Sequence, residues 1–430
     1  MADRTVVVVG ASLAGSAAAT LLAREGARVT LVEKAPDPAH HKRVCGHFIQ
    51  ASGVPAIERL GVLGALHDAG AVDSRGELWT RFGRIASPAV PPSLNIRRET
   101  MDPIVRRFAA ETPGVELLLG EAVTDLLPEG GVRLRSGREL RADLVVGADG
   151  RDSRVAELAG VPEQVSPHGR FSYGAYYEGP LPDGTTNGTV WFLDPDWAAA
   201  FPTDDGLVMY ACMLSHDRLA DFKGDIAGAL ERFVAGLPEA PPILQSRRVS
   251  DAIGKVKMDN RMRRPVGDRV ALVGDAALAT DPLYGVGCGW AFQSAEWLGE
   301  SLAAWARGDG ALEAGLRRYR RTWTKRLTPH VRMIHAYSMP RPFNGMEKRL
   351  YAVAAQDPKV AEQMGRIGTR IDSPMKVMRP GTLRRIMRGP RPRTSAGVTS
   401  AGRPDPPSEI GAGPPAGYSS TTRTSPSLTA

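Results

Sequence analysis

The sequence predicts an α/β fold in which a Rossmann-type domain carries an inserted β-sheet domain and a C-terminal helical region. Residues 5–33 follow the order strand, glycine-rich turn, helix, strand. Two further apolar runs also lead into an aspartate: 144–150 ends in Asp149-Gly150, and 269–275 ends in Asp275. Residues 168–258 between them are rich in short alternating segments typical of β-strands. We therefore expect the Rossmann part to be assembled from both sides of the inserted sheet.

The first segment has the features of a dinucleotide site. A run of valines ends at Gly10 and leads into GASLAG, with Ser12 where the second glycine of GxGxxG usually lies. Gly10 permits a sharp turn, and Gly15 permits close packing of helix on sheet. The N-terminus of the helix offers free N–H groups and a positive dipole end to a pyrophosphate. Glu33 lies 23 positions after Gly10, near the ~20 expected of an acid that binds a ribose hydroxyl.

Composition excludes several classes of protein. The 430 residues include only three cysteines, without a CxxC pair, which favours a reducing, cytoplasmic location. We expect no signal peptide, because the first apolar run begins too early and is broken by glycine, and no apolar run reaches the ~18 residues that a membrane span needs. His40, His41 and His47 are close in sequence, but their spacing fits no familiar metal site, so we expect no metal.

The net charge of +8 is concentrated in one segment. Seven basic residues and no acid lie between positions 374 and 393, so the rest of the chain is near neutral. This distribution argues against a nucleic-acid partner. The segment also contains interleaved Met, Val and Ile residues that could contact an anionic membrane, but a solvated face is the preferred interpretation.

Periodicity predicts the remaining elements. Four short strands at 115–119, 122–127, 132–135 and 140–141 are expected to form an antiparallel meander, and short strands are expected within 76–97 and at 247–258. Helices are expected at 57–66, 98–111, 226–237, 290–307, 311–335 and 345–366. Residues 390–430 are rich in Pro, Ser, Thr and Gly, which predicts a disordered tail.

Three Gly/Asp motifs stand in order: Gly10–Gly15, Gly147–Gly150 and Gly274–Ala277, the last followed by Pro282 and spaced glycines. In this order they resemble the FAD-dependent oxidoreductases of the p-hydroxybenzoate hydroxylase-like and geranylgeranyl reductase-like superfamily, over roughly residues 5–310. The resemblance implies an FAD-binding domain, an inserted sheet that binds a small-molecule substrate, and NAD(P)H as electron donor, used directly or through a separate flavin reductase. The expected division is FAD-binding domain 1–165 and 261–310, substrate domain 166–260, helical region 311–389 and tail 390–430.

The resemblance also implies which residues bind FAD. Gly10, Ser12 and Gly15, with Leu13 and Ala14 between them, would face the pyrophosphate, and Glu33 beside Lys34 would bind the adenosine ribose. Arg43 would lie near the diphosphate, and Arg98 over the adenosine side. Asp149 and Gly150 would touch FAD and, transiently, NAD(P)H. Asp275 would accept a hydrogen bond from a ribityl hydroxyl. The isoalloxazine edge would meet Pro282, Gly285, Gly287, Cys288 and Gly289.

Oxygen transfer by a reduced flavin needs a dry pocket more than a protein nucleophile. The resemblance therefore implies a monooxygenase that hydroxylates or epoxidises an aromatic or apolar molecule, in specialised metabolism such as antibiotic biosynthesis. No catalytic residue is identified. The pocket candidates are Cys45 and the aromatic residues Tyr173, Tyr176, Trp191, Trp197, Phe201 and Tyr210.

Two relatives offer alternative activities. Cys45-Gly46 resembles a pair in the geranylgeranyl reductases, which reduce carbon–carbon double bonds. Their YxWxFP motif is only partly kept in residues 197–202, because Ala199 replaces its central Trp. Flavin-dependent halogenases use a pocket lysine, but the chain has no lysine between Lys42 and Lys223, which disfavours halogenation.

Overall fold

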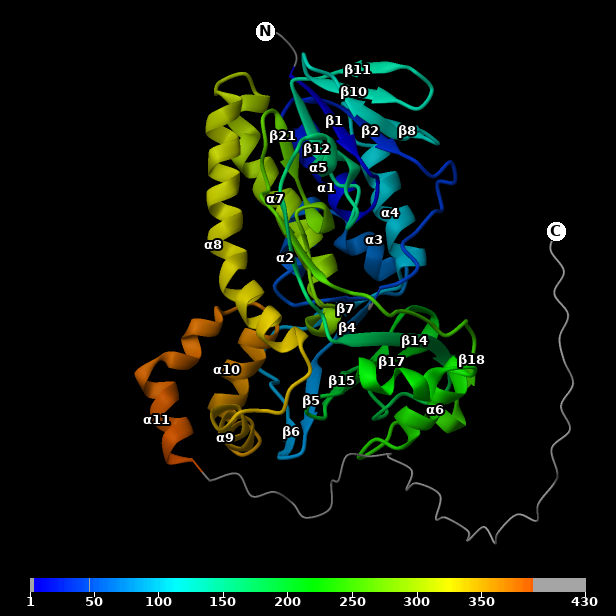
Figure 1. The fold of residues 1–430 in the computed structure, drawn as a ribbon, viewed down its shortest axis with the longest axis vertical. Helices are drawn as coiled ribbons and strands as arrows, with labels where there is room; N and C mark the ends of the chain where they lie inside the picture. The colour runs from blue at the N-terminus through cyan, green and yellow to red at the C-terminus, as the bar shows by residue number, and fades with distance from the viewer. Residues whose placement is uncertain (1–3, 46, 390–430) are drawn as a thin grey trace, which may run out of the picture.

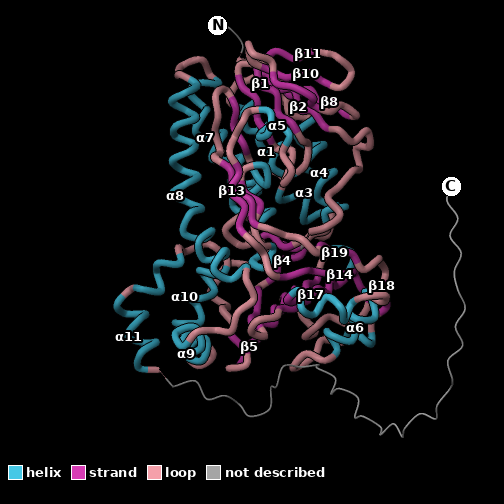
Figure 2. The backbone as a smooth tube through the Cα atoms, in the orientation of Figure 1, coloured by secondary structure: helices cyan, strands magenta, loops and turns pink. Residues whose placement is uncertain are grey.

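The computed structural model describes residues 4–45 and 47–389, and its upper half is built on a parallel sheet (Figures 1 and 2). This sheet has five strands in the order β21-β12-β1-β2-β8. All neighbouring strands are parallel, and their apolar runs are buried, as expected of a sheet covered on both faces. The strands are β1 (Thr5–Val9), β2 (Arg28–Glu33), β8 (Val115–Leu119), β12 (Leu144–Gly147) and β21 (Val270–Leu272).

Four long helices accompany this sheet and share its hydrophobic core. They are α1 (Leu13–Arg24), α4 (Arg98–Ala110), α7 (Gly287–Ala306) and α8 (Leu312–Ser338). The short helix α5 (Arg154–Leu158) follows β12. In Figure 1, α8 runs along the side of the parallel sheet and continues down to the lower half of the molecule. The α/β architecture with a Rossmann-type domain is thus confirmed.

The lower half contains an eight-stranded sheet, mostly antiparallel. Its central path is β14-β17-β16-β15, extended by β18 and β19 at one end and by β5 and β6 at the other. The strands are β5 (Gly76–Thr80), β6 (Gly83–Ile85), β14 (Arg170–Glu178), β15 (Gly188–Phe192), β16 (Trp197–Pro202), β17 (Leu207–Ser215), β18 (Arg247–Arg248) and β19 (Ile253–Lys255). Strand β5 pairs in parallel with β15, so the N-terminal part of the chain completes this sheet.

Three small sheets complete the β-structure. Strands β9 (Val123–Leu126), β10 (Gly131–Leu134) and β11 (Glu139–Arg141) form the expected meander, but β8 does not join it. The reason is that β8 pairs along its whole length with Val29 to Glu33 of β2. The other two sheets consist of β3 (Phe48–Ile49), β7 (Ser93–Asn95) and β4 (Val72–Ser74), and of β13 (Glu163–Ser166), β20 (Asn260–Arg263) and β22 (Leu278–Ala279).

Three expected elements are divided in the structure. The helix expected at 57–66 is two helices, α2 (Val54–Leu60) and α3 (Leu63–Asp68), because Gly61 ends the first in a left-handed conformation (φ 91°). The helix expected at 345–366 is α9 (Gly345–Ala354) and α10 (Pro358–Gly368), because Asp357 caps the second and Pro358 cannot continue the first. The strand expected at 247–258 is split into β18 and β19.

The two faces of the large sheet have different covers. Helix α6 (Ile226–Ala235) and one cluster that includes Trp191 and Tyr210 lie on one face. The C-terminal helices α9, α10 and α11 (Pro380–Arg388) join a second cluster around Phe192 and Trp197. The helical C-terminal region is therefore confirmed, whereas the tail expected at 390–430 lies outside the described residues. No helix within 4–45 and 47–389 is long and apolar enough to span a membrane.

Buried histidines make stability depend on pH. His330 of α8 is 7% exposed, and burial lowers its pKa to about 4. In the unfolded chain the pKa returns to about 6.5, so below that pH the unfolded state binds more protons. We expect the free energy of unfolding to be highest above pH 6.5 and to fall progressively toward pH 4. Urea unfolding at pH 7.5 and 5.5 measures this, and H330F should reduce the difference. H40N, which replaces an exposed histidine, is the control and should leave the pH dependence unchanged. If H330F also leaves the pH dependence unchanged, the assignment to His330 is wrong.

Candidate functional site

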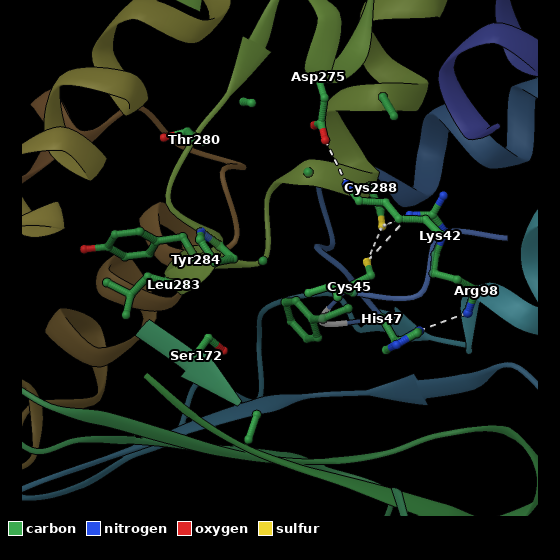
Figure 3. A pocket seen from close by; sticks show the side chains of 18 of the residues that line it. Lys42, Cys45, His47, Arg98, Ser172, Asp275, Thr280, Leu283, Tyr284 and Cys288 are labelled. Carbon is green, nitrogen blue, oxygen red and sulfur yellow. Dashed lines mark hydrogen bonds and ion pairs between the residues drawn. The ribbon is translucent and has the colours of Figure 1, made fainter. Parts of the chain in front are cut away.

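One large cavity joins the two halves of the molecule. Its volume is about 1360 Å³, and it extends from the turn after β1, past the large sheet, to the C-terminal helices. Pockets for single small molecules usually measure ~300–1,000 Å³. The cavity therefore has room for a dinucleotide and a second molecule. Figure 3 shows its central part, where segments from the β2–β3 connection, α4 and α7 meet.

The turn after β1 is shaped for a phosphate group. Gly10 adopts φ 101°, and a Cβ there would lie 2.6 Å from the carbonyl oxygen of Ala148. The Ser12 hydroxyl accepts a hydrogen bond from Arg98 rather than capping α1. The first N–H groups of α1 have no intrahelical acceptor, so they can bind an anion in the cavity.

Glu33 lies at the end of β2, beside this turn. Its Oε2 accepts a hydrogen bond from the N–H of Ala11 at 2.9 Å, and its Oε1 accepts one from the N–H of Ala35 at 2.9 Å. The side chain is buried yet lines the cavity. The backbone thus holds the carboxylate in one orientation, as recognition of a ribose diol requires. Lys34 and Arg43 also line the cavity.

Arg98 is the buried centre of a polar cluster. Its Nε donates to Asp102 Oδ1 at 2.6 Å and its Nη2 to Asp102 Oδ2 at 2.9 Å, a bidentate pair one helical turn apart. The same Nη2 donates to Ser12 Oγ at 2.7 Å. Because both side chains are buried, each depends on the other for charge compensation. The cluster ties α4 to the start of α1.

The N-terminus of α7 forms the opposite wall. The preceding residues Pro282–Tyr284 make one 3₁₀ turn that ends at Gly285, where φ is 60°. Asp275 lies next to this helix start, and Lys42 Nζ is 2.8 Å from its Oδ2. This ion pair raises the pKa of Lys42, so the lysine remains charged. The positive end of the α7 dipole and Lys42 both favour negative charge on a bound ring.

Two cysteines and a histidine lie between these walls (Figure 3). Cys45 Sγ and Cys288 Sγ are 3.6 Å apart, and Arg98 Nη1 is 3.7 Å from the first and 3.9 Å from the second. The backbone N–H of Arg98 donates to His47 Nδ1 at 2.9 Å. His47 therefore carries its proton on Nε2. Burial lowers its pKa, which keeps the ring neutral at neutral pH.

Most of the residues expected to bind FAD line the cavity, but two glycines do not. Gly15 and Gly289 are not among the lining residues. A Cβ on Gly15 would lie 1.8 Å from the carbonyl oxygen of Gly10, so its role is close packing. Asp149 lines the cavity together with Gly150, but its oxygens already accept from Ser153 Oγ at 2.6 Å and from a backbone N–H of α5.

The aromatic candidates divide between the two faces of the sheet. Trp197, Phe201 and Tyr176 line the cavity. Trp191 and Tyr210 do not, which corrects the expectation that they belong to the pocket. Both side chains are buried in the cluster on the α6 face, and the partly buried Tyr173, which does not line the cavity either, packs against that cluster. Trp191 Nε1 donates to the carbonyl oxygen of Pro238 at 2.9 Å. Successive residues of a strand point to opposite faces, so this division follows from strand register.

Four residues of the site are absent from the sequence-based set: Lys42, His47, Asp102 and Arg106. The i,i+4 spacing of Arg98 and Asp102 is a signal that sequence alone offers. Arg106 Nε donates to the carbonyl oxygen of Ala11 at 2.9 Å, a long-range contact with no local pattern. Within the described ranges, no group of three or more His, Cys, Asp or Glu side chains is arranged to hold a metal ion.

Residues 3–332 match the family model described as "FAD binding domain". The chain belongs to this FAD-binding family. FAD is thus its cofactor, with NAD(P)H as the electron donor typical of the monooxygenases in the family. The glycine turn, Glu33 and the uncapped start of α7 fit the pyrophosphate, ribose and isoalloxazine of FAD in turn. The chain is a flavoprotein oxidoreductase.

Individual relatives agree with the family. Kynurenine 3-monooxygenase of Salinispora arenicola is 29% identical over 72% of this chain and 74% of its own length. 6-Methylpretetramide 4-monooxygenase of Streptomyces rimosus is 35% identical over 37% of this chain and 42% of its own length. Digeranylgeranylglycerophospholipid reductases also match. The crystal structure of p-nitrophenol 4-monooxygenase PnpA from Pseudomonas putida superimposes with a TM-score of 0.70 at 21% identity, covering 86% of this chain and 99% of that one.

Replacing Glu33 tests whether this residue binds the adenosine half of FAD rather than the flavin half. E33A should weaken FAD binding about 10- to 100-fold, because charged hydrogen bonds contribute ~1.5–3 kcal/mol. FMN lacks the adenosine ribose, so its affinity should be unchanged. Fluorescence titration of the cofactor-free protein with each flavin measures both values. The exposed E116A on β8 is the control. An equal loss of FMN affinity would indicate general unfolding rather than ribose binding.

Proposed function

We propose that the chain is an FAD- and NAD(P)H-dependent monooxygenase that hydroxylates a neutral aromatic molecule. The observation that supports this proposal is the chemistry of the cavity beyond the start of α7. Of the described residues, the lining residues on strands β14 to β17 and within 333–377 include no charged side chain. Burial of a charged substrate among them would be costly. A neutral, mainly apolar substrate fits this chamber.

The shape of the chamber favours an aromatic ring system. Trp197 and Tyr284 line it with ring centroids 5.7 Å apart in an edge-to-face arrangement, and Tyr337 continues the aromatic wall. Offset and edge-to-face contacts with such side chains stabilise aromatic ligands. Ala199 lies between Trp197 and Phe201 on β16 and also lines the cavity. This small side chain leaves room for a molecule larger than a single ring, such as the polycyclic compounds of specialised metabolism.

When bound, reduced FAD supplies oxygen activation. The chain's own residues orient the substrate, exclude water and stabilise charge. The start of α7 and Lys42 stabilise negative charge near the ring site. His47 can donate a hydrogen bond through Nε2 but cannot act as a base in this tautomer, because Nδ1 accepts from the backbone. A phenolic substrate would therefore be held by His47 rather than deprotonated by it.

The alternative activity is reduction of a carbon–carbon double bond. It is favoured by one specific observation: the side chain of Cys45, the first residue of the Cys-Gly sequence that resembles the reductases, lines the cavity. The two activities differ in their products. A monooxygenase adds one oxygen atom from O2, whereas a reductase adds two hydrogens and consumes no O2.

Substitutions on the two faces of the sheet test the position of the substrate. W197A should raise KM at least tenfold and lower the product formed per NADPH consumed, because the chamber loses an aromatic wall. W191F, on the α6 face, should leave both within about twofold. Steady-state kinetics with a panel of neutral aromatic metabolites measures both quantities. If W191F changes KM as much as W197A, the chamber is not the substrate site.

A further inference from the structure

Cys45 and Cys288 come from segments far apart in the chain. They are separated by 243 positions, yet their sulfur atoms are 3.6 Å apart. Cys45 lies in the connection between β2 and β3, which has no regular secondary structure at this point, and Cys288 lies in the first turn of α7. Both side chains line the cavity and are reachable by small molecules that enter it. Figure 3 shows the two sulfurs facing each other.

We propose that Cys45 and Cys288 form a redox-active pair that hydrogen peroxide converts to a disulfide. A disulfide bond measures about 2.05 Å, so the sulfurs need to approach by only ~1.6 Å. The irregular segment around Cys45 can supply this movement more readily than the first turn of a buried helix. The proposal does not depend on the proposed substrate or on monooxygenation.

The surroundings favour a thiolate at Cys45. The hydrogen bond from Cys288 lowers the pKa of Cys45, and the nearby positive charges of Arg98 and Lys42 lower it further. The thiol of Cys288 is the partner that keeps its proton, because its pKa is raised by the same hydrogen bond and by burial. A thiolate beside a cation, with a thiol in contact, is the arrangement of an attacking and a resolving cysteine.

The reaction balances without a further reagent. The Cys45 thiolate attacks one peroxide oxygen; an S–O bond forms, the O–O bond breaks, and the released hydroxide takes a proton to become water. The Cys288 sulfur then attacks the sulfenic acid; the S–S bond forms and the S–O bond breaks. The hydroxide leaves with the Cys288 proton as a second water. In total, two thiols are oxidised by two electrons and one peroxide is reduced.

Cys212 provides an internal control. It also lines the cavity, from β17, but burial raises its pKa to about 12, which keeps the thiol protonated at neutral pH. The chain of 430 residues has three cysteines. Oxidation of the proposed pair should therefore leave one thiol free to react with an alkylating reagent.

The test uses the purified flavoprotein with all 430 residues. After exposure to micromolar hydrogen peroxide and addition of catalase, the protein is denatured in N-ethylmaleimide, and its mass is measured. We expect labelling to fall from three cysteines to one, and trypsin to release peptides 44–59 and 270–307 as a pair that separates on reduction. Three labelled cysteines, oxidation of Cys212 at the same rate, or oxidised Cys45 without the linked pair would overturn the proposal.

Two variants establish the order of attack. In C288S, the sulfenic acid at Cys45 should persist and be trapped by dimedone at least tenfold more than in the parent. In C45S, Cys288 should remain alkylatable after the same exposure. Circular dichroism shows whether each variant is folded. If a variant does not fold, the labelling and peptide experiment on the unaltered protein still tests the proposal. Peroxide-dependent loss of Cys288 labelling in C45S would contradict the assignment.

Discussion

R98M should lower the free energy of unfolding by about 3–5 kcal/mol and weaken FAD binding at least 100-fold. The substitution leaves the buried Asp102 carboxylate without its bidentate partner, and an uncompensated buried charge has a cost of this size. It also removes the hydrogen bond to Ser12 at the start of α1. Urea unfolding and a flavin fluorescence titration measure the two effects.

A matched control lies on the same helix. R107M removes an exposed arginine of α4 and should change neither quantity by more than about twofold or 0.5 kcal/mol. The double variant R98M/D102N removes the unpaired charge and should recover much of the stability without recovering FAD affinity. If R98M is as stable as R107M, the buried pair does not hold the site together.

G15A should prevent FAD binding and destabilise the fold by more than about 4 kcal/mol. A Cβ on Gly15 would lie 1.8 Å from the carbonyl oxygen of Gly10 and 3.0 Å from Ala148 Cβ. No rotamer relieves a backbone clash of this kind, so α1 would have to move away from the glycine turn that its dipole serves.

The same Gly-to-Ala substitution at Gly64 in α3 is the control, and it should raise the free energy of unfolding instead of lowering it. Apart from Gly64 itself, its chain neighbours and the backbone of its own helix, no described atom lies within 4 Å of a Cβ built at Gly64. G64A should therefore stabilise the protein by up to about 1 kcal/mol, the propensity difference between Gly and Ala in a helix. FAD affinity should be unaffected. A G15A protein that binds FAD within threefold of the parent would show that the close approach is not required.

The parts of the site that sequence predicts are those set by local chemistry. The turn at Gly10, the acid at Glu33 and the run from Pro282 into α7 need particular residues at fixed spacing, so they are visible in the chain. The same holds for the parallel strands, whose apolar runs are buried on both faces.

The parts that sequence does not predict are long-range. Strand β5 pairs with β15 more than 100 positions away, and no local pattern marks that pairing. The large sheet is covered on both faces, so apolar alternation cannot tell Trp197, in the cavity, from Trp191, in the core beside α6. The contact between Cys45 and Cys288 likewise exists only once β3 and α7 meet.

The proposed reaction transfers oxygen from O2 to a neutral aromatic molecule beside the start of α7. The most direct measurement is incubation of the FAD-loaded protein with NADPH and a substrate panel under ¹⁸O2, followed by mass spectrometry of the products. We expect a product that carries one ¹⁸O atom, formed from an uncharged aromatic compound. A product that gains two hydrogens and no ¹⁸O, or turnover confined to charged substrates, would contradict it.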